Sequence, residues 1–232
     1  MRGPRCRAGP LQPQEQEPQT GQSTMILPAY VEGDLSPSQL DNLTHLASFA
    51  PHWYWWRPGE KAPQSPAGGP GKVDDPKTAG TLDQAIKAMH SRGGGGVGLL
   101  VNQGRAGLVG VDLDNVVHEG EFHPLALEAI EHFKGAYVEV SPSLTGIRIF
   151  ATGAVPDGTP KGSTAIGQSF HGKAIKFEVY AAGGRGRFLR TTGALIEGTA
   201  GAVGPCQDGV EWLAGVMASA RPASPDNATS NV

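Results

Sequence analysis

The segment GLVGVDLDN, residues 107–115, sets two carboxylates two positions apart at the end of an apolar run. In a β-strand, Asp112 and Asp114 point to the same face, and Leu113 points to the other face. Neighbouring carboxylates repel each other, and a bound divalent cation removes that repulsion. Mg²⁺ and Mn²⁺ prefer oxygen ligands of this kind, so the pattern predicts a metal site. The alternative is a turn that the two aspartates and Asn115 simply flank.

Glu178, in the segment KFEVY, is a candidate third carboxylate. Its apolar neighbours Phe177 and Val179 indicate a second strand with one buried face. If the two strands are neighbours, the three carboxylates form a platform for two metal ions, which suits in-line phosphoryl or nucleotidyl transfer. The alternative is a glutamate that faces solvent.

The charges divide by region, although the net charge of the chain is only −3. Residues 112–139 contain seven acidic residues against Lys134, whereas residues 141–192 contain seven basic residues against Asp157 and Glu178. Basic strands beside a carboxylate cluster suit a polyphosphate that is bound through metal. The alternative is a set of ordinary solvated lysines and arginines.

The segment SPSLTGIRIF, residues 141–150, combines hydroxyl groups, a glycine and an arginine. Ser141 and Ser143 could donate hydrogen bonds, and Gly146 lets the backbone come close to a ligand. Arg148 follows on the outgoing strand, where its planar guanidinium could hold phosphate oxygens. The alternative is a tight hairpin whose hydroxyls bind their own backbone.

The elements that would position these groups alternate between helical and strand spacing. The pattern predicts helices over 36–50, 81–92, 124–135 and 208–220, and strands over 53–57, 97–102, 108–114, 136–143, 146–153, 173–182 and 187–193. The strands 97–102 and 108–114 are expected to form a hairpin through QGRAG. Helices followed by a run of strands favour an α+β fold with a mainly antiparallel sheet.

Composition limits the classes of protein to which the chain can belong. Residues 1–25 and 221–232 are polar and are predicted to be disordered tails around a main domain over 26–205 and a helix over 206–220. Cys6 and Cys206 lie far apart and predict neither a disulfide framework nor a zinc site, which suits a reducing cytoplasm. No apolar run approaches the roughly 18 residues of a membrane span. The polar start does not match a secretory signal.

The ordered motifs VDLDN, SPSLTGIRIF, KFEVY and RFLRTTG resemble the primase-polymerase catalytic domain of the archaeo-eukaryotic primase superfamily, in its phage and plasmid branch. Upstream, WYWWRPGEKAP and DPKTAGTLDQAIKA are similar to the lead-in of that family. The resemblance covers about residues 50–200. It implies an RRM-like catalytic core with an N-terminal α/β module. It also implies template-directed synthesis of DNA by two-metal nucleotidyl transfer, in phage or plasmid replication in the cytoplasm of a bacterial or phage-infected cell.

The resemblance assigns roles to single residues. Asp112, Asp114 and Glu178 would be the catalytic ligands of Mg²⁺ or Mn²⁺. The nucleotide, a dNTP or an NTP, would be bound by a second set of residues: Ser141, Ser143, Gly146, Arg148 and Lys176. Arg187 and Lys61 would contact single-stranded template DNA or phosphate. No GxxxxGK[ST] stretch is present, so a helicase partner would be a separate chain or a further region.

The chain departs from the family pattern at three positions. Leu144 replaces a usual glycine, which predicts a different or strained turn, Arg148 stands where related enzymes often have histidine, and Gly80 replaces a common tryptophan. Two other functions stay open at this point. A metal-dependent nuclease needs the same carboxylates but attacks with water, and a non-catalytic DNA-binding replication module keeps the fold without metal.

Overall fold

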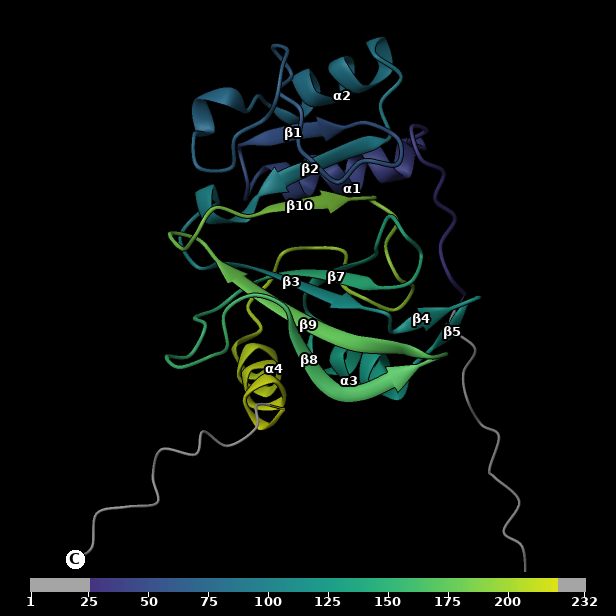
Figure 1. Ribbon diagram of the computed structural model, residues 1–232, viewed down its shortest axis with the longest axis vertical. Helices are drawn as coiled ribbons and strands as arrows, with labels where there is room; N and C mark the ends of the chain where they lie inside the picture. Colours follow the sequence, from purple (N-terminus) through teal and green to yellow (C-terminus); the bar gives the residue numbers. More distant parts are fainter. Residues whose placement is uncertain (1–25, 221–232) are drawn as a thin grey trace, which may run out of the picture.

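A computed structural model describes residues 26–220, which form an α+β fold with mainly antiparallel sheets (Figure 1). The helices are α1 (Pro37–Ala47), α2 (Leu82–Ser91), α3 (Pro124–His132) and α4 (Gln207–Ser219), with 3-10 turns η1 (Pro76–Thr78) and η2 (Val101–Gln103). The strands are β1 (Trp53–Trp56), β2 (Gly96–Leu100), β3 (Leu108–Asp114), β4 (Val117–His118), β5 (Glu121–Phe122), β6 (Tyr137–Val140), β7 (Ile147–Thr152), β8 (Thr164–Phe170), β9 (Lys173–Ala181) and β10 (Phe188–Thr191). The predicted α+β class with a mainly antiparallel sheet is confirmed.

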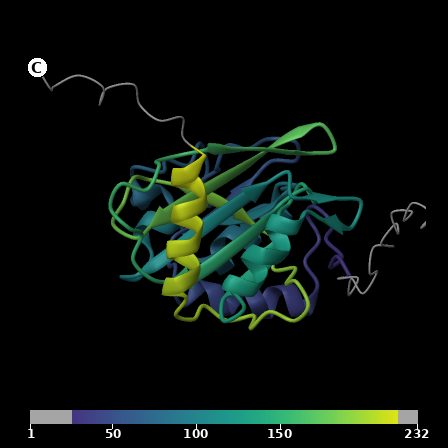
Figure 2. The same cartoon turned by 90° about the horizontal axis from the view of Figure 1, so that it is seen from below.

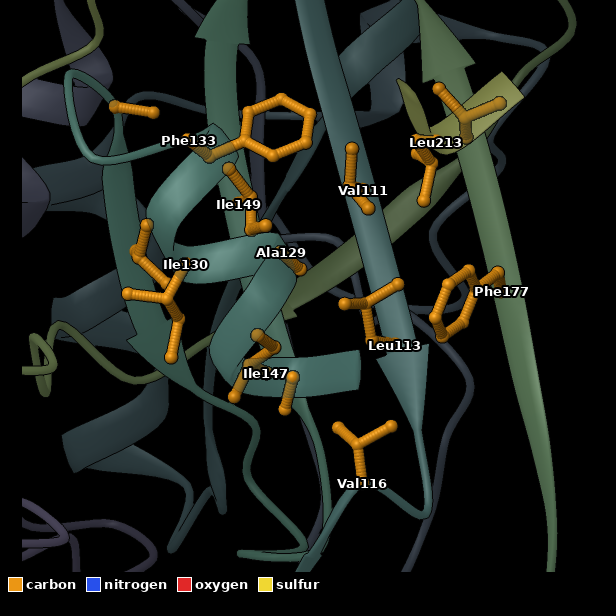
Figure 3. Packing of buried hydrophobic residues seen from close by; sticks show 14 of the residues in the cluster. Val111, Leu113, Val116, Ala129, Ile130, Phe133, Ile147, Ile149, Phe177 and Leu213 are labelled. Atoms are coloured by element: carbon orange, nitrogen blue, oxygen red, sulfur yellow. The ribbon is translucent and has the colours of Figure 1, made fainter. Parts of the chain in front are cut away.

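The larger sheet has five antiparallel strands in the order β6-β7-β3-β9-β8. One of its faces is covered by α3 and α4, which lie side by side across it (Figure 2). Val111, Leu113 and Phe177 pack there with Ala129 of α3 and Leu213 of α4 (Figure 3). Burying a large apolar side chain stabilises the fold by about 1.5–3 kcal/mol, so this core fixes which face of β3 is left for polar groups.

The smaller sheet, in the order β1-β2-β10, lies above the other face of the larger sheet and is flanked by α1 and α2 (Figure 1). All four residues of β1 are buried, as expected for an aromatic strand in the core. Leu108, Phe150 and Leu189 join the two sheets in a second hydrophobic cluster. β10 follows β9 in the chain but pairs with β2, so it ties the N-terminal part to the larger sheet.

The helix starts follow the local sequence. Ser36 caps α1 and Thr81 caps α2, each in a capping box with a glutamine three residues later. A cap of this kind contributes about 1 kcal/mol because it satisfies backbone N–H groups that have no partner in the first turn. The helix ranges predicted from the sequence, 36–50 and 81–92, begin at these two cap residues.

The predicted hairpin between residues 97–102 and 108–114 is wrong. β2 pairs with β1 and β10, whereas β3 pairs with β7 and β9, and η2 lies between β2 and β3. Both strands already have two neighbours, so they cannot pair with each other. The short strands β4 and β5 and the whole of β8 were not predicted. In β8 only Ile166 is buried, so the alternation that would reveal the strand is weak.

The predicted disordered tails, 1–25 and 221–232, lie outside the described residues. The predicted C-terminal helix is present as α4, and Val210, Leu213 and Met217 place it in the core of the larger sheet. Between residues 26 and 220, no helix is both long and apolar enough to cross a membrane.

Candidate functional site

A row of charged side chains crosses the face of the larger sheet that is turned away from α3 and α4. Glu139 of β6 is opposite Arg148 of β7, Arg148 is opposite Asp112 of β3, and Asp112 is opposite Glu178 of β9. Neighbouring strands lie about 4.8 Å apart, and directly opposite residues share a face. All four residues are buried, with exposed fractions between 0% and 7%. The sheet therefore holds three carboxylates and one guanidinium in one line.

Asp112 forms a bidentate ion pair with Arg148. Arg148 Nε donates to Asp112 Oδ1 at 3.2 Å and Nη2 donates to Oδ2 at 3.3 Å, while Nη1 donates to the carbonyl oxygen of Arg190 on β10. Arg148 thus connects the larger sheet to the smaller one. In this structure its guanidinium binds a carboxylate and a backbone carbonyl. That Arg148 binds phosphate stays a prediction.

Glu178 is paired with a second arginine. Arg187 Nη2 donates to Glu178 Oε2 at 2.5 Å, and the hydroxyl of Tyr180 donates to the same oxygen. The guanidinium of Arg187 also lies 4.7 Å from the centre of the Tyr180 ring. Burial, followed by the hydrogen bond to Glu178, raises the pKa of Tyr180. Tyr180 therefore stays protonated and acts as a hydrogen-bond donor at neutral pH.

Asp114, unlike Asp112 and Glu178, forms no ion pair with another residue in the range 26–220. Burial raises its pKa, the charges of Asp112 and Glu178 raise it further, and Arg148 and Lys61 oppose the shift. Asp112 and Glu178 are therefore close enough to Asp114 for electrostatic repulsion between the carboxylates. Lys176 is opposite Asp114 in the register and is exposed, so its ammonium is free to meet a ligand at the edge of this face.

The serine turn lies where β3 ends. The Ser141 hydroxyl accepts from the Gly146 N–H at 3.1 Å, and hydroxyl groups connect Ser141, Ser143 and Thr145 at 3.0 and 2.9 Å. A Cβ at Gly146 would collide with the Leu113 carbonyl oxygen, so glycine allows this turn to touch β3. These contacts match the alternative of a tight hairpin whose hydroxyl groups form hydrogen bonds within the turn. Ser143 is nevertheless exposed and can also contact a ligand.

Leu144 in this turn has a φ of 57°, a left-handed conformation that costs a non-glycine residue about 1–2 kcal/mol. The strain expected from leucine in place of glycine is therefore present. Leu144 is 36% exposed, so burial of its side chain can offset only part of this cost. The turn is held by its hydroxyl chain and by the N–H groups of Val116 and Val117, which both donate to the Thr145 carbonyl.

Two charged residues of the site were missed from the sequence. Glu139 is fully buried and accepts hydrogen bonds from the N–H groups of Thr192 and Gly193 and from the Tyr137 hydroxyl. Burial is the main cause that raises its pKa to about 7. Arg190 of β10 lies 5.3 Å from the Trp56 ring, and burial lowers its pKa. An acidic residue inside the apolar segment YVEV was the available signal for Glu139.

The donor set fits Mg²⁺ or Mn²⁺ in its chemistry, since it consists of carboxylate oxygens on one face of a rigid sheet. As the side chains lie, no three His, Cys, Asp or Glu residues within 26–220 are arranged to hold a metal ion. In the free protein Arg148 engages both oxygens of Asp112, and Arg187 engages Glu178. The two guanidinium groups supply the positive charge that the carboxylates need.

The structure brings together most of the residues that the sequence analysis selected. Asp112, Asp114, Glu178 and Arg148 are neighbours, and Arg187 reaches them through Glu178. Three further selected residues border the group: Gly146 next to Asp114, Lys176 opposite it, and Lys61 in the loop after β1. Ser141 and Ser143 lie in the adjoining turn.

A scan of the sequence against protein-family models found no match, and a search of curated proteins also found none. The resemblance to primase-polymerases therefore rests on the motifs and stays a prediction.

Proposed function

We propose that this protein is a template-directed DNA primase or polymerase that acts by two-metal nucleotidyl transfer in phage or plasmid DNA replication. The observation that carries the proposal is the position of Asp112, Asp114 and Glu178. They lie on one face of adjacent strands, and their charges act on one another. If Glu178 pointed to the opposite face of the sheet from the two aspartates, the proposal would have no basis.

Bound Mg²⁺ or Mn²⁺ would lower the pKa of the attacking 3′-hydroxyl and stabilise the leaving pyrophosphate. Asp112, Asp114 and Glu178 would be the ligands of the ions. Arg148 and Arg187 would exchange their carboxylate partners for phosphate oxygens, which the planar guanidinium binds with similar geometry. The exchange keeps both arginines paired in the free and the loaded protein, so neither guanidinium is left without a counter-charge.

The serine turn would bind the triphosphate beside Asp114. Ser143 is exposed at that end of β3, and Lys176 and Lys61 carry positive charge near the same aspartate. Tyr180, protonated at neutral pH, would hold Glu178 in place from the other side. No residue has to act as a general base in this arrangement.

An RRM-like core is part of the proposal. The segments β3, α3, β6, β7 and β9 supply a β-α-β-β-β run with the strand order β6-β7-β3-β9, and α3 and α4 cover one face. A βαββαβ unit has its second helix between the third and fourth strands. Here α4 follows β10 instead, and β8 occupies part of the segment between β7 and β9.

The proposed partners follow from the reaction. Single-stranded DNA is the template, a dNTP or an NTP is the substrate, and a helicase on another chain or in a further region would open the duplex. The proposed location is the cytoplasm of a bacterial or phage-infected cell.

The test is template-directed extension of a labelled primer on a single-stranded oligonucleotide, with Mg²⁺ or Mn²⁺ and each nucleotide pool. The parent protein is expected to lengthen the primer, and a variant with Asp112→Asn and Asp114→Asn to lose extension by at least about 100-fold, or about 2.7 kcal/mol of transition-state stabilisation. A matched control is Asp83→Asn, because Asp83 is an exposed aspartate on α2. Equal extension by the parent and the double variant would remove these residues from the mechanism.

A non-catalytic DNA-binding module is the second candidate, and the arginine pairs favour it. Arg148 and Arg187 already neutralise Asp112 and Glu178 without metal. In that case the protein binds single-stranded DNA but neither lengthens nor shortens it in the same assay. A metal-dependent nuclease, the third candidate, would shorten the labelled strand.

A further inference from the structure

A cleft of about 730 Å³ opens at the end of the larger sheet that lies away from the serine turn. Its walls are the loop 155–162, the last residues of β9, the turn 184–187 and the pair Val73–Asp74. Figure 1 shows the connection between β9 and β10 at one end of the sheet and the β4–β5 hairpin, which follows β3, at the other. The cleft thus flanks the carboxylates on the side opposite Ser141–Gly146.

The register gives the distance along the sheet. Gly110 of β3 is opposite Tyr180, which lines the cleft, and Asp114 of β3 lies beside the serine turn. Four residues of a strand span about 13 Å. The two ends of the site are therefore too far apart for one small phosphate group, and Asp112 and Glu178 lie between them.

The cleft is connected to the carboxylates through two side chains. Tyr180 and Arg187 line the cleft, and both donate hydrogen bonds to Glu178. The turn that carries Arg187 is held against the wall of the cleft, because a Cβ at Gly186 would lie 2.6 Å from Asp74 Oδ1 and 2.8 Å from the Val73 carbonyl oxygen. A ligand in the cleft would touch the groups that orient Glu178.

The charges and surfaces of the cleft suit a polyanion with flat rings. Three cations (Lys161, Arg185 and Arg187) and two acids (Asp74 and Asp157) line the cleft. Arg187 is already paired with Glu178, so Lys161 and Arg185 are the cations left for an anionic ligand. Lys161 and Arg185 are exposed and form no ion pair with other described residues. A second group of lining residues offers apolar surface beside the aromatic ring: Val155, Pro156, Pro160 and Val179. Cations that follow a backbone, together with an aromatic platform, are the means by which proteins hold single strands.

We propose that this cleft binds single-stranded nucleic acid and guides the strand to the carboxylates from the Tyr180 side. The triphosphate would arrive from the serine-turn side. The inference deepens the proposed function and rests on it for the direction of the strand. Lys161 and Arg185 contact phosphates, and the ring of Tyr180 offers a surface to a base.

The test is binding of a fluorescein-labelled oligothymidylate, followed by anisotropy in EDTA over a range of NaCl concentrations. The cleft variant carries Lys161→Gln and Arg185→Gln, and the control variant carries Lys87→Gln and Lys134→Gln. The control loses the same charge from two exposed sites elsewhere. Each phosphate contact on a single strand contributes about 0.7 to the slope of log K against log salt. The cleft variant should lose about 1.4 from the slope, which corresponds to about 25-fold weaker binding at 0.1 M salt if affinities converge at 1 M. The control should keep the parent slope.

Each outcome separates this inference from the proposed function. A cleft variant with the parent slope overturns the inference even if the parent extends primers. A parent that does not bind the oligonucleotide at low salt overturns it as well. A lower slope in the cleft variant alone supports the inference, and it does so even if the parent incorporates no nucleotide, in which case only the proposed function fails.

Discussion

Replacement of Arg148 by methionine tests whether the arginine is the counter-ion of the carboxylate row. The substitution keeps much of the side-chain length and removes the charge. It leaves Asp112, 7% exposed, without its partner beside Asp114 and Glu178. Removing one partner of a buried ion pair costs about 3–5 kcal/mol because the other charge stays buried and unpaired. A domain with about 10 kcal/mol of stability would remain folded.

The assay is urea unfolding followed by the fluorescence of the buried tryptophans of β1. With a slope of about 2 kcal/mol per molar urea, the midpoint of Arg148→Met should fall by about 1.5–2.5 M. The double variant Arg148→Met with Asp112→Asn should recover part of that loss, because the uncompensated charge is gone. The coupling between the two positions should therefore be at least about 1 kcal/mol.

A divalent cation supplies the second arm of this experiment. Without Arg148, the oxygens of Asp112 are free, so Mg²⁺ or Mn²⁺ should stabilise the Arg148→Met variant more than it stabilises the parent. At a concentration of 100 times the dissociation constant, the gain is about 2.7 kcal/mol. Additive effects of the two substitutions, together with equal stabilisation of parent and variant by metal, would refute the idea that Arg148 holds the place of a cation.

Three further predictions concern single side chains. Asp114→Asn should raise the melting temperature at pH 7 without metal. The pKa of Asp114 is raised in the folded protein, so its contribution to stability is full below the unfolded pKa of about 3.9 and is lost as pH rises through the folded pKa. The gain should vanish in melts at pH 3, and a constant gain at all pH values would contradict the assignment. Glu139→Gln, compared with the parent in the same melts, should become relatively more stable as pH rises from 4.5 to about 7, the folded pKa of Glu139; no change of the difference over that window would argue against a titrating Glu139. Leu144→Gly should raise stability by up to about 1 kcal/mol in urea unfolding, because glycine adopts the left-handed conformation without strain, and a loss of stability would show that the leucine side chain matters more than its backbone.

The sequence was sufficient to predict the parts of the site that depend on the alternation of apolar and polar residues along a strand. The apolar neighbours of Asp112 and Glu178 fixed the buried faces of β3 and β9, and the shared face of the carboxylates followed once the strands were neighbours. Pairing between distant strands was harder to predict. The expected hairpin of β2 and β3 failed because β10, almost 90 residues later in the chain, takes the place beside β2.

The ionic partners could not be predicted, because they depend on register. Arg148 lies 36 residues after Asp112, and only the pairing of β3 with β7 sets the two side chains opposite each other. Glu139 shows the same limit, since its backbone partners at Thr192 and Gly193 come from the end of β10. Motif spacing indicated which residues could do chemistry, and the sheet determined which of them are paired in the free protein.

The most direct test of the central claim is Mn²⁺ binding to the purified protein, measured by titration calorimetry or by loss of the free-ion electron paramagnetic resonance signal. The parent should bind Mn²⁺, and Glu178→Gln together with Asp112→Asn should weaken binding by at least about tenfold, or 1.4 kcal/mol. Glu131→Gln on the exposed surface of α3 is the matched control and should bind like the parent. A parent that binds no Mn²⁺ at millimolar concentration, or a double variant that binds as tightly as the parent, would contradict a metal site at these carboxylates.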